Sequence, residues 1–88
     1  MDKGAVYILR CKNGRYYIGS TNNLRRRLNE HEQGIVSATK HVRPIVLVFS
    51  HEFATLVKAR QVEYRLKKQK SRVLIEHIIS DKHIQFAE

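Results

Sequence analysis

The sequence predicts one small domain that combines β-strands with α-helices. Strands are indicated by short segments rich in β-branched and aromatic residues at 5–9 and 16–18, and by an uninterrupted apolar run at 44–49. Helices are indicated at 22–33 and 54–69, where apolar residues recur three or four positions apart. A chain of 88 residues has room for a single domain with one modest core.

The first two strands are predicted to form a hairpin around residues 12–14. A two-residue loop would place Tyr7 and Tyr17 on opposite faces, because side chains alternate along a strand. A three-residue loop that ends in a left-handed glycine pairs Tyr7 with Gly19 and Tyr17 with Leu9. We predict the three-residue loop, which puts both phenols on one face of the sheet.

The predicted helix at 22–33 is bounded by polar residues that can cap its start and by Gly34, which can end it. Helical spacing places Arg27 and His31 one turn apart, on the side that carries Leu24 and Leu28. Because the leucines dock the helix, we expect both polar side chains to lie beside the core.

The helix at 54–69 raises a question about one acidic residue. Its predicted buried stripe consists of Leu56, Ala59, Val62 and Leu66. Glu63 lies at the edge of this stripe. A carboxylate at the edge of an apolar face is unfavourable unless a basic group pairs with it or a metal ion binds it.

The remaining segments are assigned more simply. Residues 35–43 are predicted to be a polar connection, and the apolar run at 44–49 is typical of a strand covered on both faces. Residues 67–72 form a basic shoulder after the second helix, and Ser71 can cap a short third helix that continues to Ile79.

Net charge is the strongest signal in the composition. Seventeen Lys and Arg against eight Asp and Glu give a net charge of +9, which favours binding to a polyanion, above all nucleic acid. No apolar run approaches the roughly 20 residues that span a bilayer, so we expect no membrane association. Cys11 is the one cysteine and cannot form an intramolecular disulfide. With no signal peptide predicted, we expect a cytoplasmic protein.

A set of short motifs is distributed along the chain. Ala-Val-Tyr at 5–7 and Tyr-Ile-Gly at 17–19 are separated by nine residues. They are followed by Arg27 on the first helix, Arg43-Pro44 before the third strand, and Glu-x-x-x-Lys-Lys at 63–68. Together these motifs resemble the GIY-YIG nuclease domain, most closely its small stand-alone bacterial members, with Ala-Val-Tyr in place of Gly-Ile-Tyr.

The resemblance covers about residues 4–75 and implies an α/β (α+β) domain, with a small three-stranded antiparallel sheet flanked by helices. We expect this one domain to occupy residues 1–88. The resemblance further implies metal-dependent cleavage of a phosphodiester bond in DNA, with Mg²⁺ or Mn²⁺ as cofactor and one ion expected. Damaged or branched DNA, as it arises in repair or recombination, is a substrate that fits this activity.

Carried over position by position, the resemblance also implies the roles of individual residues. It makes Tyr7 and Tyr17 the paired active-site tyrosines, Arg27 the ligand of the scissile phosphate, and Glu63 the metal ligand. His31 is the match to the histidine position on the family's helix. Further contacts to nucleic acid are expected from a glycine that lets the backbone approach and from basic side chains: Gly19, Arg25, Arg26, Lys40, Lys67, Lys68 and Lys70.

These residue types suit phosphodiester cleavage. A guanidinium binds the negative charge that accumulates on the phosphate, and a hard cation held by one carboxylate and waters stabilises the departing oxygen. A tyrosine hydroxyl can orient or deprotonate the attacking water if the cation and the arginine lower its pKa. We therefore expect the two phenols, the guanidinium and the carboxylate to converge on one basic cavity.

Simpler interpretations remain open for the same residues. The tyrosines can be cross-strand packing, Arg27 a solvated charge, Glu63 the partner of a lysine, and His31 an ordinary packing histidine. The corresponding alternatives for the whole protein are a catalytically inactive nucleic-acid-binding module and a protein-interaction domain. Larger nucleases of the family carry a separate DNA-binding domain, so a protein partner can supply specificity here.

Overall fold

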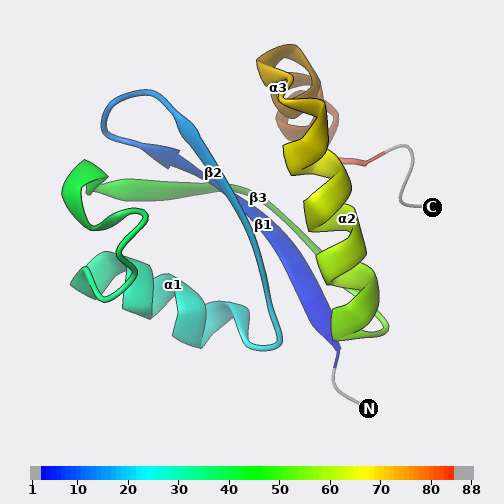
Figure 1. The fold of residues 1–88 in the computed structure, drawn as a ribbon, viewed down its shortest axis with the longest axis horizontal. Coiled ribbons are helices and arrows are strands. Elements are labelled where there is room, and N and C mark those ends of the chain that lie inside the picture. Colours follow the sequence, from blue (N-terminus) through cyan, green and yellow to red (C-terminus); the bar gives the residue numbers. More distant parts are fainter. Residues whose placement is uncertain (1–2, 85–88) are drawn as a thin grey trace.

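The computed structural model describes residues 3–84, so predictions that concern residues 1–2 and 85–88 lie outside the described part of the chain. The elements are, in order, β1 (Gly4–Cys11), β2 (Tyr16–Thr21), α1 (Leu24–Gln33), the 3₁₀ turn η1 (Lys40–Val42), β3 (Ile45–Phe53), α2 (Leu56–Gln69) and α3 (Arg72–Asp81). The strands form one antiparallel sheet in the order β2-β1-β3. Figure 1 shows α1 on one side of the sheet and α2 with α3 on the other. The predicted α+β class is confirmed.

The hairpin has the predicted register. Tyr7 pairs with Gly19 and Leu9 pairs with Tyr17, so both phenols lie on the α1 side of the sheet. Gly14 in the three-residue loop has φ of +82°, a left-handed conformation that residues with a Cβ rarely adopt. The turn thus fixes the pairing, and the pairing places the tyrosines.

β1 is the central strand and is covered on both faces. Its residues alternate between a core shared with α2 and α3 and a second set, including Tyr7 and Leu9, on the α1 side. The core on the α2 and α3 side consists of Val6, Ile8, Phe49, Phe53, Ala59, Val62, Leu66, Ile75, Ile78 and Ile84. Tyr7 and Leu9 are at most 1% exposed, so a phenol is held rigidly at the centre of the sheet.

The prediction that the third strand is covered on both faces is wrong. Val46 is 50% exposed and Leu47 is 39% exposed, whereas Phe49 and Phe53 are buried. Because β3 lies at an edge of the sheet, it is buried over only part of its length. The coverage of both faces that the apolar run predicted for β3 is found instead at the central strand β1.

The segment predicted as a polar connection is also more than a surface loop. Residues 35–43 contain η1, and both Val36 and Thr39 within them are buried. Thr39 is fully buried, and a histidine satisfies its hydroxyl there, as described below. In α2, Leu56 is half-buried rather than part of the fully buried stripe.

The helix ends follow the predicted caps. The side chain of Asn23 accepts from Arg26 N at the start of α1, and the side chain of Ser71 accepts from Leu74 N at the start of α3. α3 continues two residues beyond the predicted end. Across residues 3–84, no helix combines the length and the apolar character that a membrane span requires.

Candidate active site

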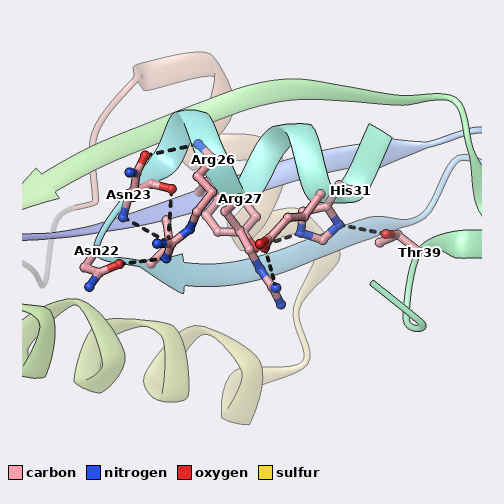
Figure 2. Close-up of polar contacts among 9 residues, drawn as sticks. Asn22, Asn23, Arg26, Arg27, His31 and Thr39 are labelled. Atoms are coloured by element: carbon pink, nitrogen blue, oxygen red, sulfur yellow. Dashed lines mark hydrogen bonds and ion pairs between the residues drawn. The ribbon is translucent and has the colours of Figure 1, made fainter. Parts of the chain in front are cut away.

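Three buried side chains form a hydrogen-bonded chain on the α1 side of the sheet. The Tyr7 hydroxyl lies 2.9 Å from His31 Nε2, and His31 Nδ1 lies 2.7 Å from Thr39 Oγ1. Figure 2 shows His31 projecting from α1, with Thr39 beyond its ring. All three residues are at most 1% exposed, so the imidazole is fixed through both of its nitrogens.

Tyr17 completes an aromatic cluster with these residues. Its ring centroid lies 6.3 Å from that of Tyr7 and 5.1 Å from that of His31. The rings are tilted or edge-on, which are favourable geometries for aromatic pairs. Tyr17 is half-buried whereas Tyr7 is buried, so Tyr17 is the phenol that reaches the surface.

Gly19 makes room for the Tyr7 phenol. It lies directly opposite Tyr7 in the β1–β2 pairing, and a Cβ at Gly19 would lie 2.5 Å from Tyr7 Cζ. Any other residue at this position would therefore push the phenol or the strand aside. Gly19 itself is buried, and its predicted contact with nucleic acid stays a prediction.

Arg27 projects from the same side of α1 as His31, one turn earlier (Figure 2). Its Nη1 donates to Glu30 Oε1 at 3.1 Å, and its side chain is 35% exposed. Hydrogen bonding to Tyr7 and Glu30 raises the pKa of Arg27, so the guanidinium is always charged. Arg27 thus combines a fixed orientation with enough exposure to bind an anion.

Burial sets the protonation states of the inner residues. It raises the pKa of Tyr7 to about 12, although hydrogen bonding from Arg27 lowers it. The expected effect of the arginine is present, but burial outweighs it and Tyr7 stays protonated. Burial and the Arg27 charge also lower the pKa of His31, so the imidazole is neutral at pH 7.

These states favour one tautomer of His31. Because arginine only donates hydrogen bonds, a Tyr7 oxygen that accepts from Arg27 directs its own proton toward His31 Nε2. His31 then carries its proton on Nδ1 and donates it to Thr39 Oγ1. The chain Tyr7–His31–Thr39 therefore has one consistent direction of donation.

Glu63 approaches this cluster from α2, around the free edge of β2. Its Oε1 accepts from the Ser20 hydroxyl, and its Oε2 lies 2.6 Å from Lys67 Nζ. Lys67 Nζ in turn lies 5.7 Å from the centroid of the Tyr17 ring. The Glu63 charge also helps to raise the pKa of Tyr7, with a smaller effect than burial and the other neighbours. The structure therefore brings the two phenols, Arg27 and His31 together and places Glu63 beside them, paired with a lysine.

The donor set at Glu63 suits a hard cation with few protein ligands. Among residues 3–84, no group of three or more His, Cys, Asp or Glu side chains gathers closely enough to hold a metal ion. Mg²⁺ requires fewer protein ligands, because it keeps several waters and commonly binds one or two carboxylates together with substrate phosphates. The Glu63 side chain is 20% exposed and lies next to a hydroxyl, which fits such a site.

Two of the predicted nucleic-acid contacts lie next to this site. Lys67 and Lys70 both line a hollow of about 260 Å³ at the junction of the hairpin, α2 and α3. Lys67 also contacts Glu63, so the hollow and the candidate site share this residue.

The other predicted basic contacts lie elsewhere on the surface. Arg25 and Arg26 line a hollow on α1 together with Glu32, which also lies in a second hollow with Lys40. Lys68 Nζ lies 6.0 Å from the centroid of the Tyr64 ring, on the exposed part of α2. The hollows and the ring contact described for these four basic residues do not include Arg27 or Glu63.

Ser20 and Thr39 are site residues that the sequence analysis did not assign. Strand alternation would have placed Ser20 on the face opposite Tyr17, toward α2 and Glu63. Thr39 lies in a segment without periodicity, so its contact with His31 is seen only in the structure.

Comparison with known proteins identifies the family of this chain. The family model described as the GIY-YIG catalytic domain matches residues 3–76. The chain is 42% identical over 65 residues to a UPF0213 protein of Nitratidesulfovibrio vulgaris, a match that covers 73% of this chain and 59% of that protein. It is 40% identical over 63 residues to the UPF0213 protein YazA of Bacillus subtilis, covering 70% and 64% respectively. The chain thus matches about three fifths of the length of these two relatives.

A solved structure shares the fold. The solution NMR structure of the UPF0213 protein BH0048 from Bacillus halodurans has a TM-score of 0.59 and 35% sequence identity, covering 91% of this chain and 85% of that one. The family match spans most of the sequence and includes both tyrosines, Arg27 and Glu63. The chain therefore belongs to the GIY-YIG family.

Proposed function

We propose that this protein is an endonuclease that cleaves phosphodiester bonds in DNA with the help of one Mg²⁺ or Mn²⁺ ion. The observation that carries the proposal is the arrangement around the edge of β2. Tyr17 packs against His31 on the α1 side, and its ring lies 5.7 Å from Lys67 Nζ, the partner of Glu63 on α2. Family membership supports nuclease chemistry, a nucleic-acid substrate and a divalent metal. The net charge of +9 supports a polyanionic substrate.

The half-exposed residues are the candidates for direct contact with substrate. Arg27 binds the scissile phosphate and stabilises the negative charge that develops on the phosphate oxygens during cleavage. Tyr17 orients the attacking water, because its phenol reaches the surface beside the same region. Glu63 holds the metal ion, which when bound polarises the phosphate and stabilises the departing oxygen.

The buried residues form a second layer that supports these groups. Tyr7 is too deeply buried to touch a substrate in this conformation, and it lies between Arg27 and His31. It therefore orients the guanidinium, while neutral His31 can take up the Tyr7 proton through Nε2. Thr39 keeps the acceptor nitrogen of His31 directed at Tyr7.

One observation favours a second candidate function, a catalytically inactive nucleic-acid-binding module. Both Glu63 oxygens have protein partners, the Ser20 hydroxyl and the Lys67 ammonium, so the carboxylate is satisfied without a metal ion. Under this alternative the fold and the positive charge are kept for binding, and Glu63 is a structural partner of Lys67.

Plasmid nicking separates the two functions. Supercoiled plasmid is incubated with protein and Mg²⁺, with Glu63→Gln and Arg27→Gln as test variants and Lys58→Gln as a matched surface control. We expect nicking by the wild-type protein and by Lys58→Gln, and at least about 100-fold slower nicking by the two test variants. Equal rates for the wild type and Glu63→Gln, or no nicking with either Mg²⁺ or Mn²⁺, would refute the nuclease and leave the binding module.

A further inference from the structure

We propose that the hollow between the hairpin, the end of α2 and the start of α3 is a phosphate-binding subsite for the DNA strand beside the scissile phosphate. The inference rests on the proposed function and extends it by a second place where the substrate is held. The hollow has a volume of about 260 Å³, and its polar lining consists of Arg15, Tyr16, Lys67, Lys70, Ser71 and Arg72.

The charge of the hollow identifies the ligand as an anion. Four of its lining residues are basic, and among the lining residues that the structure describes there is no Asp or Glu. Within residues 3–84, neither Arg15 nor Lys70 has a carboxylate partner. Cations that share a hollow repel one another, and a phosphate group relieves this repulsion and accepts their hydrogen bonds.

One side of the hollow is already organised without a ligand. Arg72 Nη1 donates to the Gly14 carbonyl at 3.1 Å, and its guanidinium lies over the Tyr16 ring at 4.9 Å from the centroid. On its other side, Arg72 Nε lies 3.3 Å from Glu76, which does not line the hollow. The hairpin and α3 therefore hold the arginine in place, so little ordering is needed when a phosphate binds.

Lys67 connects the hollow to the candidate active site. It lines the hollow, and its Nζ lies 2.6 Å from Glu63 Oε2 and 5.7 Å from the centroid of the Tyr17 ring. A strand with one phosphate at Arg27 and Glu63 can therefore continue past Lys67 into the hollow. We commit to a backbone phosphodiester as the ligand; a free phosphate has the same chemistry and is an outcome of the test.

The test is the salt dependence of DNA binding. The double variant Arg15→Gln/Lys70→Gln is compared with Lys58→Gln/Arg60→Gln, which removes the same charge from a different hollow at the start of α2. Binding of a fluorescent 20-base-pair duplex is measured by anisotropy from about 50 to 300 mM KCl without divalent metal. We expect the first variant to reduce the slope of log K against log[KCl] by about 1–2, because each lost phosphate contact removes about 0.9. The second variant should change the slope by less than half as much.

The outcomes are distinct from those of the nicking experiment. Equal slopes for the two double variants would overturn the subsite, because only the general field of the protein would then matter. Inorganic phosphate is added in a separate NMR titration. If it shifts the amide signals around Arg15 and Arg72 while the Arg15→Gln/Lys70→Gln variant keeps the wild-type slope, the hollow takes free phosphate and the strand assignment is wrong. If Glu63→Gln loses nicking but keeps the wild-type salt dependence of DNA binding, the result supports the proposed cleavage and leaves the subsite unaffected, so the two proposals can fail independently.

Discussion

Replacement of Thr39 by valine tests whether the buried network orients His31. Valine has nearly the same shape as threonine but removes the hydroxyl that lies 2.7 Å from His31 Nδ1. Because both residues are fully buried, water cannot replace the lost partner, and an unsatisfied buried N–H destabilises a protein by about 1–3 kcal/mol. For a domain of this size, each kcal/mol lowers Tm by about 4–8 °C. Thr39→Ser keeps the hydroxyl and loses one buried methyl group, at about 1 kcal/mol.

Stability alone does not distinguish orientation from packing, so the assay also observes the imidazole. The ¹⁵N chemical shifts of the His31 ring report which nitrogen carries the proton. We expect Thr39→Ser to keep the wild-type Nδ1–H signature, and Thr39→Val to move it toward Nε2–H with slower plasmid nicking. Unchanged ring shifts in Thr39→Val, or a free energy of unfolding equal to that of the wild type, would show that Thr39 does not orient His31.

Three further predictions concern the same region. Gly19→Ala should lower the free energy of unfolding by about 1–3 kcal/mol in chemical denaturation, because its Cβ would collide with the Tyr7 phenol; wild-type stability would contradict the close approach. Since the pKa of His31 is lowered from its ordinary value near 6.5, the folded state binds fewer protons, and stability should fall as pH drops below about 6.5. His31→Gln should flatten this fall by up to about 1.4 kcal/mol per pH unit, and an unchanged slope would contradict the assignment. Lys67→Gln should tighten Mn²⁺ binding, followed by EPR without DNA, by about twofold to fivefold, since it removes the ion pair that occupies Glu63; weaker binding would place the ion elsewhere.

The hairpin shows how far sequence reasoning reaches. Loop length and strand alternation together predict the Tyr7–Gly19 pairing, because a shift of the strand pairing by one residue would move a phenol to the other face of the sheet. The predicted neighbourhood of Arg27 and His31 follows equally directly from helical geometry. These parts of the site depend on contacts that are local in sequence.

The third strand and the connection before it show where this reasoning ends. Both β1 and β3 contain continuous apolar runs, and only the order of strands in the sheet decides that β1 is central and β3 is at an edge. The burial of Thr39 depends on its contact with His31, eight residues away on α1, in a segment with no periodic pattern. Glu63 was predicted at the edge of an apolar face, but its link to Tyr17 through Lys67 requires the packing of α2 on the sheet.

The central claim is that groups from both sides of the β2 edge surround one metal-bound phosphate. The most direct test is a Mn²⁺ titration of ¹⁵N-labelled protein bound to a DNA duplex with a phosphorothioate backbone that resists cleavage. We predict paramagnetic broadening of amide signals around Glu63 on α2 and, at the same Mn²⁺ concentration, around Tyr17 and Arg27, with no such pattern in Glu63→Gln. The account would be contradicted by an absence of broadening. It would also be contradicted if amide signals across the basic surface broadened to the same extent in the wild type and in Glu63→Gln.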